Sequence, residues 1–286
     1  MRRVIGALGL TVLAAGFTAA PKSLRFAEID LRTGVRMHYA EQGDPAGPAL
    51  ILLHGYSDSW FSFSRVLPLL APKFHVFVLD QRGHGRSAAP DAGYAPADLA
   101  EDVLAFMDAR DIARATLVGH SMGSFVAQEA AASAPGRVTR LVLVGSAAAP
   151  ARMAGREELE AVVMALEDPV PEPFIREFQM STMQREVPAE FLNRVIVESA
   201  RLTAARWKAL LQGMLAMGPA TALARAEIPA LVIWGDRDAL FTRAHQDELV
   251  ALVKAERLVV YEGTGHAPHW EEPERFARDL VRFVSP

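Results

Sequence analysis

Ser121 stands in a five-residue run whose residue types and spacing would allow a serine to act as a nucleophile. The run 119–123 reads Gly-His-Ser-Met-Gly, follows the apolar run 115–118 and precedes the alanine-rich stretch 122–134. In a pattern Gly-x-Ser-x-Gly, a sharp turn from strand to helix exposes the serine hydroxyl above the edge of a sheet. The N-terminus of the helix also favours negative charge beside that hydroxyl. We therefore predict that Ser121 is a catalytic nucleophile.

A histidine downstream could supply the base that a weakly nucleophilic serine hydroxyl needs. His266 ends the run Gly-Thr-Gly-His at 263–266, directly after the last apolar run of the chain. We expect its loop to reach the same sheet edge as Ser121, so that His266 acts as general base and then as general acid. His269 is the alternative, although a loop or pocket-wall role is the simpler interpretation of it. We expect His120 to point away from Ser121 and to pack in the core.

Two aspartates could orient that histidine, and both follow the apolar run that ends at Trp234. The loop reads Gly-Asp-Arg-Asp at 235–238. We predict that Asp238 is the catalytic acid, because it lies further into the loop and closer to His266. We interpret Asp236 as a turn residue, since aspartate side chains favour turns through local hydrogen bonds. The chain order of the three candidates is then serine, aspartate and histidine.

Main-chain N–H groups could stabilise the oxyanion that forms in acyl transfer. One candidate donor is the N–H of Met122, the residue after the nucleophile. The other is the N–H of Tyr56, in the loop after His54 and Gly55. We interpret a further glycine-rich run, 80–87, as a tight turn braced by Asp80 and Arg82, because its spacing differs from that of a phosphate-binding loop.

Composition excludes several other kinds of site. The 286 residues carry a net charge of −4 with no long basic run, so we expect no nucleic-acid partner. There is no cysteine, which excludes a cysteine nucleophile, thiolate metal sites and disulfides. The residues that could do chemistry require no metal and no organic cofactor. They imply that the substrate is a small molecule with an ester-like bond.

A regular alternation of strands and helices would position these residues. Six uncharged apolar runs are typical of strands buried on both faces, at 49–53, 75–79, 115–118, 141–144, 230–234 and 258–261. A hairpin, 24–31 and 35–40, precedes them, and helical patterns occupy 96–109, 122–134 and 271–284. Alternation of this kind predicts an α/β fold with one mainly parallel sheet and helices on both faces. From about 149 to 222 no strand is evident, which indicates a helical insertion.

The first 20 residues have the layout of a secretory signal peptide. Two arginines precede an uncharged, mostly apolar run at 4–17, and small residues follow at 18–20. The apolar run is shorter than the ~20 residues that span a bilayer. We therefore expect export to the periplasm or the medium, with no stable transmembrane segment in the mature chain. The alternative is a cytoplasmic protein with an unprocessed apolar extension, because Pro21 after Ala20 is a poor context for cleavage.

Together these motifs resemble the α/β-hydrolase family over residues 24–284, with matching runs at 54–56, 80–87, 119–123, 235–238 and 263–266. The resemblance implies a mostly parallel sheet of eight strands with a helical cap after the sixth. It implies a core at 23–148 and 223–286, and a cap at 149–222. Some subfamilies carry an aspartate at the nucleophile position, and Ser121 at that position argues against membership in them. Other subfamilies place the catalytic acid after the sixth strand, where this chain has Ser146, so Ser146 argues against those.

We expect hydrolysis of a carboxylic ester through an acyl-serine intermediate. The same three residues could also cleave a lactone, cleave a carbon–carbon bond in a β-diketone-like substrate, or form a peracid. A protein of another class, a hydrolase-like small-molecule receptor with little turnover, could carry the same residues. The sequence alone leaves these alternatives open.

Overall fold

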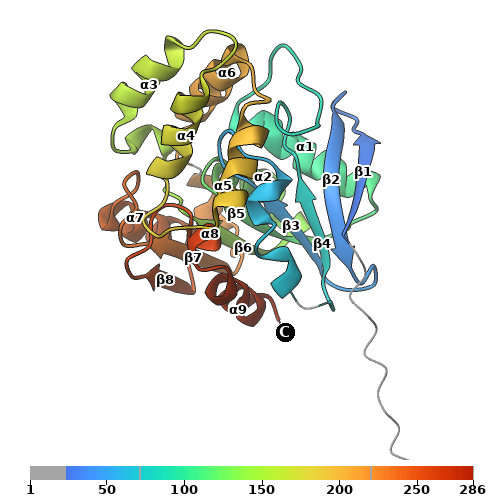
Figure 1. Ribbon diagram of the computed structural model, residues 1–286. Helices are drawn as coiled ribbons and strands as arrows, with labels where there is room; N and C mark the ends of the chain where they lie inside the picture. Colours follow the sequence, from blue (N-terminus) through green and yellow to red (C-terminus); the bar gives the residue numbers. More distant parts are fainter. Residues whose placement is uncertain (1–23, 71, 220, 286) are drawn as a thin grey trace, which may run out of the picture.

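The computed structural model describes residues 24–70, 72–219 and 221–285, and Figure 1 shows the path of the chain. These residues form one eight-stranded sheet, and β3 and β4 have the predicted bounds. The strands are β1 Arg25–Asp30, β2 Arg36–Gly43, β3 Ala49–Leu53, β4 His75–Leu79, β5 Ala115–His120, β6 Val138–Val144, β7 Ala230–Gly235 and β8 Arg257–Tyr261. The predicted signal peptide lies outside the described residues.

The sheet is mainly parallel, as predicted. Its strand order is β1-β2-β4-β3-β5-β6-β7-β8. The first two strands form the predicted hairpin, and β2 also pairs antiparallel with β4. All remaining neighbours pair in parallel. Parallel strands with crossover helices are buried on both faces, which explains why these strands are apolar without alternation.

Successive side chains of each strand pack into two separate cores. Ile51 and Leu53 face a core shared with helices α1 (Pro96–Ala109), α2 (Met122–Ser133) and α7 (Arg243–Val253). Leu50 and Leu52 face a second core. That core is completed by helix α9 (Pro273–Val284) and by the short 3-10 helices η1 (Trp60–Phe63) and η2 (Leu67–Leu69). The sheet therefore has helices on both faces.

The predicted C-terminal helix begins two residues later than expected and follows a separate short helix. Helix α8 spans Pro268–Glu271, and α9 begins only at Pro273, with Glu272 in a non-helical conformation between them. A proline lacks the N–H that would continue a helix, and it suits the first position of a new one. The prediction of one helix over 271–284 was therefore wrong at its start.

Four α-helices of the described residues lie between β6 and β7 in the chain, and Figure 1 shows α3, α4 and α6 at the top, with α5 reaching down to the middle. They are α3 Arg156–Met164, α4 Glu172–Ser181, α5 Ala189–Ser199 and α6 Ala204–Leu215. We call residues 149–222 the insertion. Among the described residues, no helix is both long and apolar enough to cross a membrane.

Parallel pairing brings the loops of interest to one edge of the sheet. Leu53, at the end of β3, pairs with Gly119 of β5, and His120 pairs with Val144 of β6. Gly235, at the end of β7, pairs with Tyr261 of β8. Since these strands all end at the same edge, the loops that carry the predicted site residues begin side by side.

Candidate active site

Ser121 occupies a strained turn between β5 and α2. Its φ angle is +49°, a conformation that is rare for residues other than glycine and that recurs at functional sites. The glycines on either side are required by close packing. A Cβ atom on Gly119 would lie 2.3 Å from the carbonyl oxygen of Gly123, and one on Gly123 would lie 2.3 Å from that of Leu53. The turn leaves the serine side chain partly exposed.

His266 and Asp238 form a buried hydrogen-bonded pair. The Nδ1 of His266 lies 2.8 Å from Oδ2 of Asp238, and both side chains are almost completely buried. The second carboxylate oxygen, Oδ1, accepts the main-chain N–H groups of Leu240 and Phe241 at 2.8 and 3.1 Å. The carboxylate is therefore fixed on both sides, and its contact with Nδ1 leaves Nε2 as the basic nitrogen of a neutral ring.

The other aspartate of the loop does not reach His266. Asp236 is partly exposed, and its Oδ1 accepts the main-chain N–H of Gly263 at 2.6 Å. That contact joins the loop after β7 to the loop after β8. The geometry thus agrees with the interpretation of Asp236 as a turn residue, while Asp238 is the aspartate that contacts the histidine.

Ser121 and His266 line one small cavity. Its volume is about 30 Å3, room for about two water molecules. The Nε2 of His266 is buried and has no hydrogen-bond partner in the described part of the chain. No hydrogen bond of the Ser121 hydroxyl occurs there either. Such contacts are often long before a substrate binds.

Of the two predicted main-chain donors, one belongs to Tyr56, which lines the cavity, and the other to Met122, the first residue of α2, directly after Ser121. Within 24–70 and 72–219, neither N–H group has an acceptor. The Tyr56 side chain has a function that the sequence did not indicate. Its hydroxyl donates to the carbonyl oxygen of Trp207 in α6 at 2.6 Å and so ties the core to the insertion.

A carboxyl group that the sequence analysis missed, that of Asp58, lines the cavity. Asp58 is 3% exposed and accepts hydrogen bonds from the Ser62 hydroxyl at 3.3 Å and from Gln179 Nε2 at 3.2 Å. Burial raises the pKa of Asp58 from 3.8 to about 7, although these hydrogen bonds oppose the shift. Asp58 is therefore mostly neutral in mildly acidic solution.

The insertion supplies one wall of the cavity. Phe178, Gln179 and Thr182 line it from α4 and the residue after it. Gln179 Nε2 also donates to Ser199 Oγ of α5 at 2.8 Å. The carbonyl oxygen of Thr182 accepts the main-chain N–H of His266 at 2.8 Å, so the insertion holds the loop that carries the histidine.

His269, the alternative base, lies outside the cavity wall. Its Nε2 is 3.1 Å from the Ser62 hydroxyl, and its ring packs 4.8 Å from that of Phe63. Burial, aided by the charge of His266, lowers the pKa of His269 to about 3. His120 is buried, as expected, and its Nε2 lies 3.1 Å from the carbonyl oxygen of His266, although His120 also lines the cavity. Both rings are packing and supporting groups.

The run 80–87 forms the expected braced turn. Asp80 accepts the main-chain N–H of Arg86 at 3.0 Å and that of Trp60 at 2.7 Å. Arg82 makes a two-pronged ion pair with Asp102 of α1, at 2.6 and 2.7 Å. Across the described range, no group of three or more acidic, histidine or cysteine side chains is arranged to hold a metal ion.

The sequence model of the alpha/beta hydrolase family matches residues 50–279 of this chain. That range contains Ser121, Asp238, His266 and every other residue of the cavity. The chain therefore belongs to the alpha/beta hydrolase family, as the resemblance of its motifs predicted. Its general class of chemistry is hydrolysis.

Three similar proteins carry different descriptions. An uncharacterized protein of Mycobacterium tuberculosis is 27% identical over 93% of this chain and 82% of its own length. A candidate carbamate hydrolase of Variovorax paradoxus is 31% identical over 87% of this chain and 96% of its own length. The crystal structure of a candidate aryl esterase from Burkholderia cenocepacia is 27% identical, with a TM-score of 0.82, over 91% of this chain and 98% of that chain. All three extend across the core and the insertion.

Proposed function

We propose that this protein is a serine hydrolase that cleaves carboxylic esters through an acyl-serine intermediate. The observation that carries the proposal is the shared cavity of Ser121 and His266, with His266 Nδ1 held 2.8 Å from Asp238. The strained turn at Ser121 supports a nucleophilic role for its hydroxyl. Similarity to a candidate aryl esterase supports an ester as the bond that is cleaved.

In the first half-reaction, His266 Nε2 accepts the proton of the Ser121 hydroxyl while Oγ forms a bond to the ester carbonyl carbon. The main-chain N–H groups of Tyr56 and Met122 donate to the carbonyl oxygen as it becomes negative. The bond to the alcohol then breaks, and His266 returns the proton to the departing oxygen. Asp238 holds the ring and stabilises its charged form throughout.

In the second half-reaction, water replaces the alcohol. His266 Nε2 removes a proton from the water as its oxygen attacks the acyl carbon. The tetrahedral species collapses, the bond to Ser121 Oγ breaks, and Oγ recovers the proton from His266. The products are a carboxylic acid and the free enzyme.

The domain division forms part of this proposal. Residues 23–148 and 223–286 supply the nucleophile, the acid, the base and the two main-chain donors. Residues 149–222 act as a cap, since Phe178, Gln179 and Thr182 line the cavity that also contains Ser121.

A cavity of about 30 Å3 favours short acyl groups. The catalytic rate on p-nitrophenyl esters should therefore fall steadily from acetate to butyrate to octanoate.

The nucleophile is tested with Ser121→Ala and a matched control, Ser133→Ala, which changes a serine at the end of α2 that lies outside the cavity. We expect Ser121→Ala to lower kcat on p-nitrophenyl acetate by at least ~1,000-fold without unfolding. Ser133→Ala should retain the wild-type rate. Comparable activity of the two variants would contradict the role of Ser121.

The acid is tested by comparing Asp238→Asn with Asp236→Asn. Asparagine at position 238 would offer His266 Nδ1 either an amide N–H or a weaker acceptor. The variant would therefore no longer fix the tautomer of the His266 ring or stabilise its charged form. We expect it to cost ~1,000-fold or more in kcat. Asp236→Asn should cost far less, because Asp236 contacts only the neighbouring loop. The reverse ranking would assign the acid to Asp236.

The same assay separates the alternatives that use this site. Turnover of lactones without turnover of p-nitrophenyl esters would make the protein a lactonase. Release of one p-nitrophenol per chain, followed by no further reaction, would identify a receptor that is acylated once. Steady turnover of the acetate ester at many equivalents per chain is the result expected here.

A further inference from the structure

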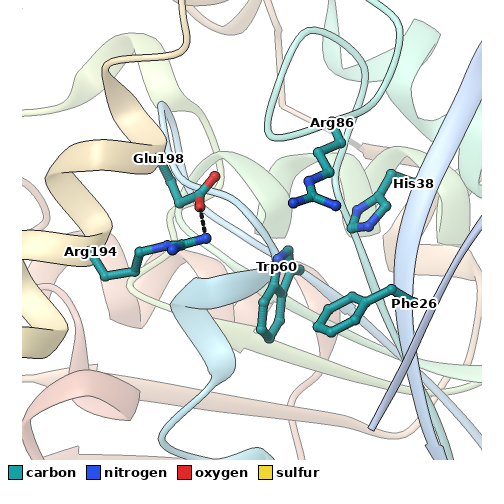
Figure 2. A pocket seen from close by; sticks show the side chains of 6 residues that line it. All are labelled: Phe26, His38, Trp60, Arg86, Arg194 and Glu198. Atoms are coloured by element: carbon teal, nitrogen blue, oxygen red, sulfur yellow. Dashed lines mark ion pairs between the residues drawn. The ribbon is translucent and has the colours of Figure 1, made fainter.

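A second cavity, of about 140 Å3, shares no lining residue with the cavity of Ser121. Figure 2 shows that its side chains converge from β1, β2, η1, the turn after β4 and helix α5. The lining residues are Phe26, His38, Trp60, Arg86, Arg194 and Glu198. The predicted catalytic residues have no part in it.

His38 presents an unpartnered nitrogen to this cavity. Its side chain is 4% exposed, and Nδ1 lies 2.7 Å from Oδ2 of Asp80. Its Nε2 is buried and has no partner among the residues that the structure describes. Buried polar atoms are nearly always hydrogen-bonded, to the protein, to water or to a ligand.

Two guanidinium groups, those of Arg86 and Arg194, line the cavity. Over the described part of the chain, the Arg86 side chain makes no hydrogen bond or ion pair, and Figure 2 shows it extended beside His38. Arg194 lies 2.6 Å from Glu198, but the Glu198 carboxylate is also held by Arg201 at 2.8 Å. The one carboxylate of the lining is thus shared between two arginines, and an anion in the cavity would reduce the excess of positive charge.

The remaining walls are aromatic. Phe26 is 49% exposed. Its ring lies edge-on to Trp60 with centroids 4.7 Å apart, and it stacks on the His38 ring at 5.7 Å. The volume of about 140 Å3 is close to that of an engineered cavity of ~150 Å3 that accommodates one benzene ring.

We propose that this cavity is a binding site for a small aromatic carboxylate, separate from the catalytic cavity. The carboxylate pairs with the Arg86 guanidinium, whose planar donors match its two oxygens, and the buried Nε2 of His38 borders the same space. The aromatic ring lies against Phe26 and Trp60. This inference rests on these residues alone and does not depend on the proposed esterase activity.

The site also has a physical route to the catalytic cavity. Trp60 is two residues after Asp58, and Glu198 is followed by Ser199, whose Oγ accepts from Gln179. Asp58 and Gln179 both line the cavity of Ser121. A ligand that presses on η1 and α5 would therefore act one or two residues from the catalytic wall.

Titration calorimetry with benzoate and acetate on the full-length chain tests the proposal. We expect one benzoate per chain, bound more tightly than acetate, with an affinity that falls as salt is raised. Arg86→Gln should weaken benzoate at least ~10-fold. Arg114→Gln, which removes an exposed arginine outside the cavity, should leave binding unchanged. Both variants should keep the wild-type rate on p-nitrophenyl acetate when no benzoate is present.

A second variant separates the contribution of the ligand's aromatic ring from that of its carboxylate charge. Phe26→Ala removes an exposed side chain, and we expect it to weaken benzoate at least ~3-fold while leaving acetate unchanged. Absence of benzoate binding at millimolar concentration would overturn the proposal. Binding that is equally strong in wild type and Arg86→Gln would also overturn it, because the ligand would then occupy another site, such as the cavity of Ser121.

Discussion

Replacing Asp58 by asparagine should make the protein more stable, and the gain should grow as the pH rises. An asparagine at position 58 would keep the shape of the carboxyl group and could accept from Gln179 while it donates to Ser62, the two side chains that Asp58 contacts. It would lack the ability to ionise. The variant therefore isolates the free energy of placing a charge at this buried position.

The size of the effect follows from the pKa. Burial raises the pKa of Asp58 from 3.8 to about 7, so the folded chain holds a proton that the unfolded chain has already released. The contribution of Asp58 to the free energy of unfolding is therefore fully present below pH ~4 and is lost as the pH rises from there to about 7. A pKa difference of about 3 corresponds to at most about 4 kcal/mol, of which about 3 kcal/mol falls between pH 5 and pH 8.

The assay is urea unfolding of wild type and Asp58→Asn at pH 5 and pH 8. We expect the difference in free energy of unfolding to increase by ~2–3 kcal/mol in favour of the variant at the higher pH. Asp91→Asn, at an exposed position, serves as the control and should show a difference that does not change with pH. An equal difference at both pH values for Asp58→Asn would mean that this carboxyl is charged in the folded chain at pH 5, which would refute the reasoning.

Three further predictions concern the neighbourhood of the site and the N-terminus. Tyr56→Phe removes the hydroxyl that donates to the Trp207 carbonyl, and should lower the free energy of unfolding by ~1 kcal/mol in urea. Gly145→Ala would put a Cβ atom 2.5 Å from the His266 carbonyl at a φ of +52°, and should lower kcat at least ~10-fold. Gly136→Ala, with nothing within 4 Å, should leave that rate unchanged. N-terminal sequencing of the native protein should find a start near residue 21 outside the cytoplasm, and Met1 in the cytoplasmic fraction would contradict export.

The six strands from β3 to β8 were predictable because each contains a short apolar run without polar alternation, and β3 and β4 were located to the residue. The turn at Ser121 was predictable because a local pattern encodes it. For the acid, the sequence narrowed the choice to two aspartates in one loop. Their difference is spatial, since Asp238 lies against His266 while Asp236 accepts from Gly263.

What the sequence did not indicate depends on contacts between distant segments. Gln179 looks like a surface residue of an amphipathic helix, yet it is 1% exposed because α4 packs on the loop after β3. Asp58 looks like a turn residue, and its raised pKa follows from that same packing. The break before α9 had a local signal in Pro273, because proline favours the first turn of a helix.

The small volume beside Ser121 also bears on the order of events after the alcohol has left. The acyl group and the water that releases it must both bind beside this cavity of about 30 Å3. As the acyl chain lengthens, it takes the place of that water, and release of the acid becomes the slow step. Rapid mixing should then show a burst of one alcohol per chain, followed by a steady rate that falls with chain length. The same chain would then turn over short acyl esters rapidly and would stay acylated longer by long ones.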